Sequence, residues 1–312
     1  MRWWKPVRLI PDDTKYPFMR LSRFGFFISG LLCLGSILLF TTIGLNYGID
    51  FKGGTVMTIR TKGPAELDKL RVELNALGLG TVELQQFGQP TDVKIRLQSQ
   101  NDEKAEIEAQ AKVTSALGPD VEIRSKETSG PTVSAEKTQQ ATAAVLLAIL
   151  FVLFYLWARF EWQFAVGAVL SLLHDVTLTI GLFCVLRLDF SLSIIAAILT
   201  IIGYSLNDTV VVFDRIREYL RKLKSMGLAD LIDHSINSVL PRTILTSLAT
   251  MMALLALYVF GGDVIRGFTF TMIWGVIVGT YSSIFIASPV LILLGTKRDL
   301  PSADSKAPAK KK

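Results

Sequence analysis

The chain has 312 residues, of which 50% are hydrophobic and 19% are charged, and its formal net charge is +6. Soluble domains carry about 25% charged residues, so this composition excludes a small soluble enzyme, a disulfide-rich secreted module and a disordered protein. The two cysteines, Cys33 and Cys184, lie inside apolar runs and cannot build a disulfide framework or a zinc site.

Six apolar runs are long enough to cross a bilayer, which takes about 20 residues. In chain order they cover approximately residues 24–45, 141–158, 164–186, 192–213, 239–260 and 268–294. No small-x-small cleavage site closely follows the first run. We therefore expect a retained anchor, preceded by a tail over residues 1–23.

Lysine and arginine gather in three segments that six spans place on one side of the membrane: residues 1–23, the loop after the fourth span, and residues 295–312. The short loops on the other side hold only Arg187 and Arg266. The positive-inside rule then predicts that both termini are cytoplasmic. The basic tails are interpreted as topology signals and contacts with membrane lipids. Nucleic-acid binding is not expected, because the basic residues lack interleaved aromatic residues.

One hydrophilic segment, residues 46–140, is predicted to lie outside, on the periplasmic side. It contains 12 basic and 14 acidic residues. Alternating apolar residues predict strands, and Pro and Gly mark helix ends. The expected elements are, in order, a strand over 55–60, a helix over 64–77, strands over 81–87 and 92–97, a helix over 102–117 and a strand over 121–124. This βαββαβ order predicts one α+β ferredoxin-like domain.

Two further segments connect the predicted parts. Residues 46–55 contain three glycines in a short stretch, which favours a constrained connection from span to strand over a phosphate cradle, because no helix begins directly after the glycines. Residues 214–238 are basic and carry an apolar stripe. They are therefore predicted to form an amphipathic segment along the cytoplasmic surface.

Ionisable residues inside membrane spans are costly and are functional candidates. Three stand out: Asp175 in the third span, Asp208 in the fourth and Arg242 near the start of the fifth. The fourth and fifth spans are antiparallel, so Asp208, roughly 8 Å from the end of its span, lies at a depth comparable to Arg242. Burial favours the neutral carboxyl, whereas a nearby guanidinium favours the ionised form. The pair fits either a proton-coupled switch or a static ion pair that fixes helix packing.

The other polar residues of the spans favour packing roles. His174 and Asp175 are neighbours in sequence and are expected to point to different helix faces, with His174 bonding a carbonyl of another helix. Small residues recur four apart at Gly275, Gly279 and Ser283 in the sixth span, and Gly203 with Asn207 is expected to do similar work in the fourth. Three residues with hydroxyl side chains lie near Arg242 in the sequence: Thr243, Thr246 and Ser247. They fit either interhelical packing or a hydrated path.

Signatures of enzymes are missing from the sequence: it contains no HExxH, no Walker A loop and no GxSxG elbow. The chain is therefore predicted not to be an enzyme, not to draw on ATP itself, and to need no metal or organic cofactor.

Five stretches carry a resemblance to a known family. They are GIDFKGGT at 48–55, HDV at 174–176, IGYSLNDTVVVFDRIRE at 202–218, RTILTS at 242–247 and the run at 268–287. With the six-span pattern, they make the chain resemble the bacterial SecF family of protein-export membrane proteins, within the resistance-nodulation-division superfamily.

The resemblance implies a complex with SecD in the bacterial inner membrane that works with the SecYEG channel, and with YajC and YidC as further partners. Such a complex would use the proton-motive force to promote late stages of the translocation of unfolded preproteins. The resemblance assigns Asp208 and Arg242 to the proton path, supported by Asn207 and Thr246, with Asp175 as a further candidate.

Two other functions are compatible with parts of the pattern. One is half of a resistance-nodulation-division-type exporter of small molecules or lipids, since a complete transporter would need about twice the spans. The other is an intramembrane aspartyl protease that uses Asp175 and Asp208. It is disfavoured because the GxGD context is missing and Asp208 lies off the centre of its span.

Overall fold

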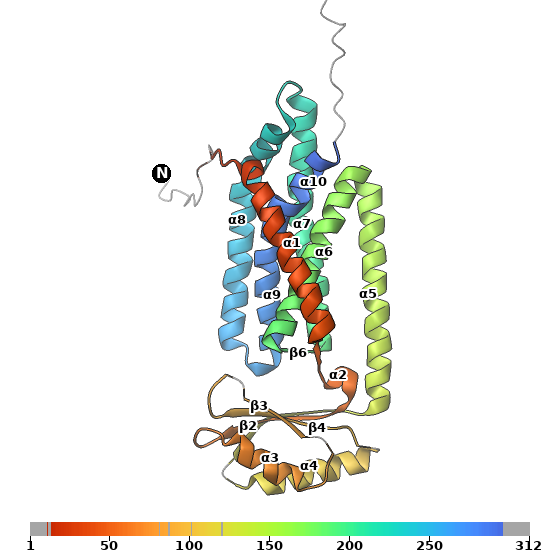
Figure 1. The fold of residues 1–312 in the computed structure, drawn as a ribbon, viewed down its shortest axis with the longest axis vertical. Coiled ribbons are helices and arrows are strands. Elements are labelled where there is room, and N and C mark those ends of the chain that lie inside the picture. The colour runs from red at the N-terminus through yellow and green to blue at the C-terminus, as the bar shows by residue number, and fades with distance from the viewer. Residues whose placement is uncertain are drawn as a thin grey trace, which may run out of the picture. The chain divides into compact units, whose positions relative to one another are not determined.

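The computed structural model describes residues 11, 14–80, 82–86, 88–100, 102–119 and 121–295. The chain divides into two compact units. The membrane unit comprises the described residues of Met1–Leu45, Ala148–Leu188 and Ala196–Lys312, and the α+β unit comprises those of Asn46–Leu147 and Asp189–Ile195. Each unit is described by itself below (Figure 1).

Six long helices carry the apolar runs: α1 (Phe18–Thr42), α5 (Pro131–Arg159), α6 (Trp162–Leu186), α7 (Leu192–Lys222), α8 (Leu228–Phe260) and α9 (Asp263–Ser282). The last continues through a π-helical turn, η1 (Ser283–Ala287), into α10 (Ser288–Leu293). Among the described residues, six helical stretches are long and apolar enough to cross a membrane. The predicted number of spans is therefore confirmed.

Helix ends depart from the predicted spans. α1 begins at Phe18, within the predicted tail, and α8 begins at Leu228, well before the predicted start at 239. The predicted amphipathic segment 214–238 is not one separate helix: its first part extends α7 and its last part opens α8. The reason is packing, because four apolar residues of this segment are fully buried in the protein core: Ile216, Leu231, Ile232 and Ile236.

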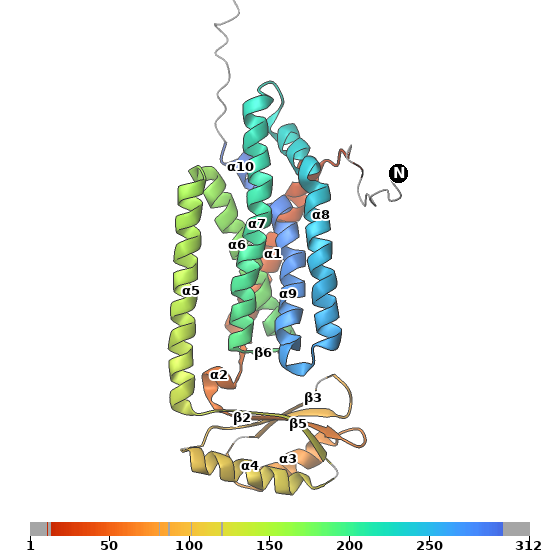
Figure 2. The ribbon, with the colours of Figure 1, turned by 180° about the vertical axis from the view of Figure 1, so that it is seen from behind.

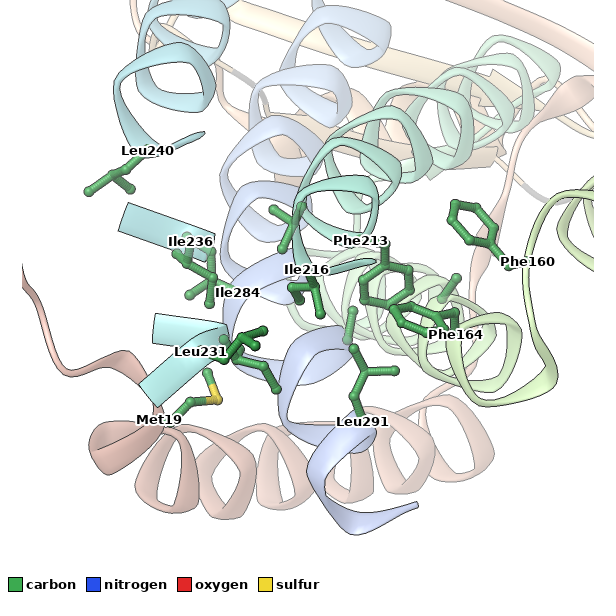
Figure 3. Close-up of a cluster of buried hydrophobic side chains, with 14 of the residues drawn as sticks. Met19, Phe160, Phe164, Phe213, Ile216, Leu231, Ile236, Leu240, Ile284 and Leu291 are labelled. Carbon is green, nitrogen blue, oxygen red and sulfur yellow. The ribbon is translucent and has the colours of Figure 1, made fainter. Parts of the chain in front are cut away.

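This core lies at one end of the helix bundle (Figure 3). Its side chains come from α1, α5, α6, α7, α8, the π-turn and α10, with Phe160 from the turn after α5. Members labelled in the figure are Met19, Phe160, Phe164, Phe213, Ile216, Leu231, Ile236, Leu240, Ile284 and Leu291. Burial of these residues fixes the mutual arrangement of the helices that carry the polar residues described below.

Glycine allows α9 to lie close against α7. A methyl group added at Gly275 would overlap the side chain of Ile201, and one added at Gly279 would lie 3.0 Å from Cβ of Ser205. The predicted packing role of the small-residue row in the sixth span is thus confirmed. The matching prediction for α7 is wrong, because Gly203 has no atom within 4 Å of an added methyl group and Asn207 is exposed.

The α+β unit contains β1 (Asn46–Tyr47), α2 (Ile49–Lys52), β2 (Gly54–Thr61), α3 (Leu67–Asn75), β3 (Val82–Gln86), β4 (Asp92–Leu97), α4 (Glu103–Leu117), β5 (Val121–Ser129) and β6 (Asp189–Phe190). From β2 to β5 the order of strands and helices is the one the sequence predicts. The four strands form an antiparallel sheet in the order β3-β4-β2-β5. α3 and α4 cover one face of it (Figure 2).

The sheet and its two helices enclose a separate hydrophobic core, which includes Met57, Ile59, Val93, Ile95 and Val113. β5 extends to Ser129, beyond the predicted end at 124, because it pairs with β2 along its length. An ion pair joins neighbouring strands on the sheet: Arg60 donates to Asp92 through Nε at 2.6 Å and Nη2 at 2.9 Å. This bond from Arg60 holds the pKa of the Asp92 carboxyl below its usual value.

The α+β unit differs from the predicted segment 46–140 in a way that matters for function. It includes residues Asp189–Ile195, which lie far along the chain, between α6 and α7. β1 pairs in parallel with β6, with Asn46 opposite Asp189 and Tyr47 opposite Phe190. The first residues of α7 therefore belong to the α+β unit, a long-range pairing that hydrophobic patterning along the chain does not signal.

Candidate functional site

Asp208 lies on α7, in the membrane unit, and is 6% exposed. Its Oδ2 accepts a hydrogen bond of 3.4 Å from the hydroxyl of Ser283, the first residue of the π-turn. The buried Thr243 hydroxyl approaches it from α8 but makes no hydrogen bond of ordinary geometry. Within the described part of the chain, this carboxylate has no ion-pair partner, so hydroxyl groups rather than a cation surround it.

Arg242 does not form the direct ion pair with Asp208 that the sequence allowed. Its side chain is exposed on α8, and it acts on Asp208 only as a more distant positive charge. Successive residues of an α-helix point about 100° apart, so when Thr243 faces Asp208 its neighbour Arg242 faces elsewhere. Pro241, which lies inside α8, directly precedes it. The structure thus contains no static ion pair between these two residues.

Asp175 is the most enclosed carboxylate of the membrane unit in the described residues, at 1% exposed. Its Oδ2 accepts hydrogen bonds from Ser205 on α7, at 2.5 Å, and from Ser282 on α9, at 2.9 Å. Ser171 in turn donates to Ser282 at 2.9 Å. Three helices are therefore held together by one carboxylate and its hydroxyl donors.

His174 completes this network, contrary to the sequence prediction. Its Nδ1 lies 2.9 Å from Oδ1 of Asp175, so the two neighbours do not point to separate faces, and His174 does not bond a carbonyl of another helix. The cause is the enclosure of Asp175, whose second oxygen finds its partner in the adjacent imidazole. The other ring nitrogen, Nε2, is buried and has no hydrogen-bond partner among the described residues.

Among the described residues, the remaining predicted site residues make no hydrogen bond to either carboxylate. Asn207 and Thr246 are exposed, and the Thr246 hydroxyl bonds to the Thr243 carbonyl of its own helix at 2.9 Å. Ser247 makes an interhelical contact instead, 2.9 Å from the Thr280 hydroxyl of α9, with Tyr204 of α7 donating to it at 3.3 Å. For Ser247, these contacts support a role in interhelical packing rather than in a hydrated path.

The sequence prediction missed Ser205 and Ser282, whose hydroxyl groups both bond Asp175. It gave Ser283, which bonds Asp208, only a packing role. A signal was present, because these serines recur on spans that face the ionisable residues. Helix rotation, which decides whether a serine reaches a carboxylate, cannot be read from spacing alone. In the stretches that the structure describes, no group of three or more His, Cys, Asp or Glu residues could hold a metal ion.

In the α+β unit, the glycine-rich segment forms a structural connection, as the sequence predicts. Gly54 adopts φ +107° and leaves no room for a methyl group beside the Leu97 carbonyl, so only glycine fits there. The carboxylate of Asp50 accepts the backbone N–H of Leu192 at 3.0 Å, at the start of α7. It also lies 3.3 Å from Nζ of Lys137.

A cluster of charges holds β6 in this unit. Asp189 pairs with Lys94 at 2.7 Å and with Arg96 at 2.8 Å, both on β4, and its Oδ1 accepts a hydrogen bond from Asn46 at 2.8 Å. The segment that leads into α7 is thus bonded to the four-stranded sheet by two cations of β4, and to β1 by the separate two-stranded β1–β6 pairing.

Two family descriptions match the chain. The C-terminal family of the protein export membrane proteins SecD and SecF matches residues 109–297, and the SecD/SecF GG motif matches residues 38–65. Among curated relatives, the protein translocase subunit SecF of Rhodobacter capsulatus is 44% identical, over 96% of this chain and 94% of that protein. The protein translocase subunit SecDF of Brucella abortus is 42% identical over 96% of this chain, which spans 40% of that longer protein.

Solved structures agree with these matches. A crystal structure of SecDF from Thermus thermophilus, described as a translocon-associated membrane protein, superposes with a TM-score of 0.82 at 34% identity, covering 94% of this chain and 40% of that one. SecDF in a form called super-membrane-facing gives a TM-score of 0.67 at 35% identity, covering 93% of this chain and 40% of that one. These matches favour a protein-export subunit, a transport protein that is not an enzyme, over the two alternative functions, an exporter half-unit and an intramembrane protease. The chain belongs to the SecD/SecF family of protein-export membrane proteins, as a SecF subunit of the SecDF translocase accessory complex.

Proposed function

We propose that this subunit couples the proton-motive force to late steps of preprotein translocation, and that Asp208 is the residue that takes up and releases the proton. The observation that carries the proposal is a carboxylate, 6% exposed, inside a membrane-spanning helix and without an ion-pair partner among the described residues. Such groups are rare in membrane spans and are functional by default. A carboxylate surrounded by hydroxyl groups can change its protonation without breaking a salt bridge.

Arg242 supplies the fixed positive charge in this scheme. Arginine does not deprotonate in proteins, so it cannot carry the proton itself. Protonation of Asp208 would remove the negative charge that attracts it and allow α7 and α8 to shift. Asn207 and Thr246, both exposed in the chain alone, would face the aqueous path or the partner. Asp175, enclosed by Ser205, Ser282 and His174, would hold the neighbouring helices in register.

The α+β unit would transmit this shift to a bound, unfolded preprotein on the periplasmic side. Its element order and the strand order β3-β4-β2-β5 support a ferredoxin-like domain. The distribution of Lys and Arg supports cytoplasmic termini, and therefore a periplasmic position for this unit. Because residues Asp189–Ile195 belong to the α+β unit and continue into α7, the chain itself links the domain to the helix that carries Asp208.

Partners follow from the family and from the fused relatives. SecD and SecF are joined in the names of the longer relatives, of which this chain spans 40%, which supports a heterocomplex with SecD in the bacterial inner membrane. We extend the proposal to the SecYEG channel, to YajC and YidC as accessory partners, to membrane lipids around the spans and to the proton-motive force as the energy source in place of a cofactor.

The test is export by an Asp208→Asn variant in cells that lack the native subunit, followed by pulse-chase labelling of a secreted preprotein. Asparagine keeps the size and hydrogen bonding but cannot carry the charge. The matched control is Asp214→Asn, the same substitution further along α7, where the carboxylate is exposed and pairs with Arg159. Export should collapse only for the first variant, with normal membrane insertion and SecD co-purification. Normal export in Asp208→Asn would refute the proposal.

A further inference from the structure

The two membrane carboxylates are bonded to consecutive residues of one helix. Ser282 donates to Oδ2 of Asp175 at 2.9 Å, and Ser283 donates to Oδ2 of Asp208 at 3.4 Å. Asp175 lies on α6 and Asp208 on α7, and no hydrogen bond joins them directly among the described residues. The short stretch Ser282–Ser283 is therefore the element that both carboxylates contact.

This stretch lies where the helix changes its winding. α9 ends at Ser282, and residues Ser283–Ala287 form a π-helical turn before α10. Pro289 follows in the first turn of α10, where it lacks the N–H that an α-helix would use four residues back. The hydroxyl of Ser288 donates to the Ser283 carbonyl at 2.9 Å, which ties the start of α10 to the π-turn. Single π-turns inside α-helices are frequent at functional sites.

Each of the two serine hydroxyls has a choice of acceptor. Ser283 lies 3.4 Å from the Asp208 oxygen and 3.0 Å from the Thr280 carbonyl of its own helix. Ser282 lies 2.9 Å from the Asp175 oxygen and 3.1 Å from the Gly279 carbonyl. A serine hydroxyl has one proton to donate, so it serves one acceptor at a time.

Ionisation of the carboxylate decides this choice. An ionised carboxylate is the stronger acceptor and draws the hydroxyl proton, whereas a protonated carboxyl is a weaker acceptor and leaves the proton to the helix carbonyl. Serine that bonds back to its own helix also tends to bend it. Proton uptake at Asp208 would therefore change the hydrogen bonding of Ser283 in the π-turn. Ser283 directly follows Ser282, the serine that bonds Asp175.

We infer that Ser283 is a positioning residue that reports the ionisation of Asp208 to the π-turn, and that Ser282 anchors this turn to Asp175. The inference rests on the proposed proton step at Asp208. Other charged or titratable groups lie around the two carboxylates: Arg242 of α8 acts on Asp208, His174 of α6 bonds Asp175, and Cys33 of α1 lies within electrostatic reach of Asp175. None of these three lies on the helix that carries the two serines.

The experiment measures proton flux over a pH series in proteoliposomes that hold the whole SecDF complex. Ser283→Ala removes the hydroxyl, and Ser283→Thr keeps it. The matched control is Ser235→Ala, because Ser235 is equally buried but donates only to the Leu231 carbonyl of its own helix. A hydrogen bond to a charged group corresponds to about one to two pH units, so the half-maximal pH of flux should move by that amount in Ser283→Ala alone.

The remaining variants make each failure distinguishable. Ser282→Ala should move the profile by less, because Asp175 keeps Ser205 and His174 as partners. If Ser283→Ala does not assemble, Ser283→Cys, whose thiol is a weak donor, should give a partial displacement. An unchanged profile in Ser283→Ala and Ser283→Cys, or an equal displacement in Ser235→Ala, overturns the inference while loss of flux in Asp208→Asn still supports the proton step. Normal flux in Asp208→Asn refutes the proton step and the inference with it.

Discussion

Replacing Gly275 by alanine adds one methyl group where α9 contacts α7. The added carbon would overlap the side chain of Ile201, which is 2% exposed and has little space to move into. Gly203, on α7, offers a matched control, because an added methyl group there meets no atom within 4 Å. Both substitutions place alanine in the middle of a long helix, so their effects on the helix backbone are alike.

The magnitude follows from these two environments. Alanine is favoured over glycine in a helix by about 1 kcal/mol, and this gain applies to both variants. Overpacking a well-filled interior costs about 1–3 kcal/mol, and this loss applies only at Gly275. Gly275→Ala should therefore be about 1–3 kcal/mol less stable than Gly203→Ala. Separation of α9 from α7 would also draw Ser283 away from Asp208, which lies on α7.

Thermal unfolding of the purified chain in detergent micelles measures this difference. A fluorogenic maleimide reports the exposure of Cys184, which is 1% exposed in the folded chain, once Cys33 is replaced by serine. The unfolding midpoint should fall by several degrees in Gly275→Ala relative to Gly203→Ala. Ile201→Ala should partly restore it, because it removes the overlapping atoms. Equal midpoints for the two glycine variants, or no restoration by Ile201→Ala, would show that the close contact of α9 with α7 is wrong.

Three other predictions concern the α+β unit. The bond from Arg60 that lowers the pKa of Asp92 stabilises the folded chain above the unfolded-state value of about 3.9, and the gain is lost as pH falls through the lower folded-state value. Asp92→Asn should thus destabilise the unit by about 1–3 kcal/mol at pH 7 and flatten the acid dependence of thermal unfolding followed by circular dichroism. Gly54→Ala should abolish folding of the sheet because φ is +107° and a backbone carbonyl fills the space, whereas Gly63→Ala, with nothing within 4 Å, should leave the circular dichroism spectrum unchanged. Asp189→Asn should speed amide exchange over residues 189–195 without affecting the central strands, and equal exchange would contradict the ion-pair cluster.

The sequence by itself determined the features that depend on local composition. Six apolar runs of membrane-spanning length predicted six helices, and alternating residues predicted the order of strands and helices from β2 to β5. Ionisable residues inside the spans drew attention to Asp175, Asp208 and Arg242. These predictions work because hydrophobic length and periodicity are properties of short segments and do not depend on distant parts of the chain.

Only the tertiary structure decided which groups meet. Thr243 rather than Arg242 turns towards Asp208, His174 bonds its own neighbour, and Ser282 and Ser283 reach different carboxylates from adjacent positions. Asp189 bonds Arg96 of β4, which precedes it by 93 residues. Helix rotation, a π-turn and a long-range strand pairing set these contacts. Each depends on how separate elements pack, which no pattern within a single segment encodes.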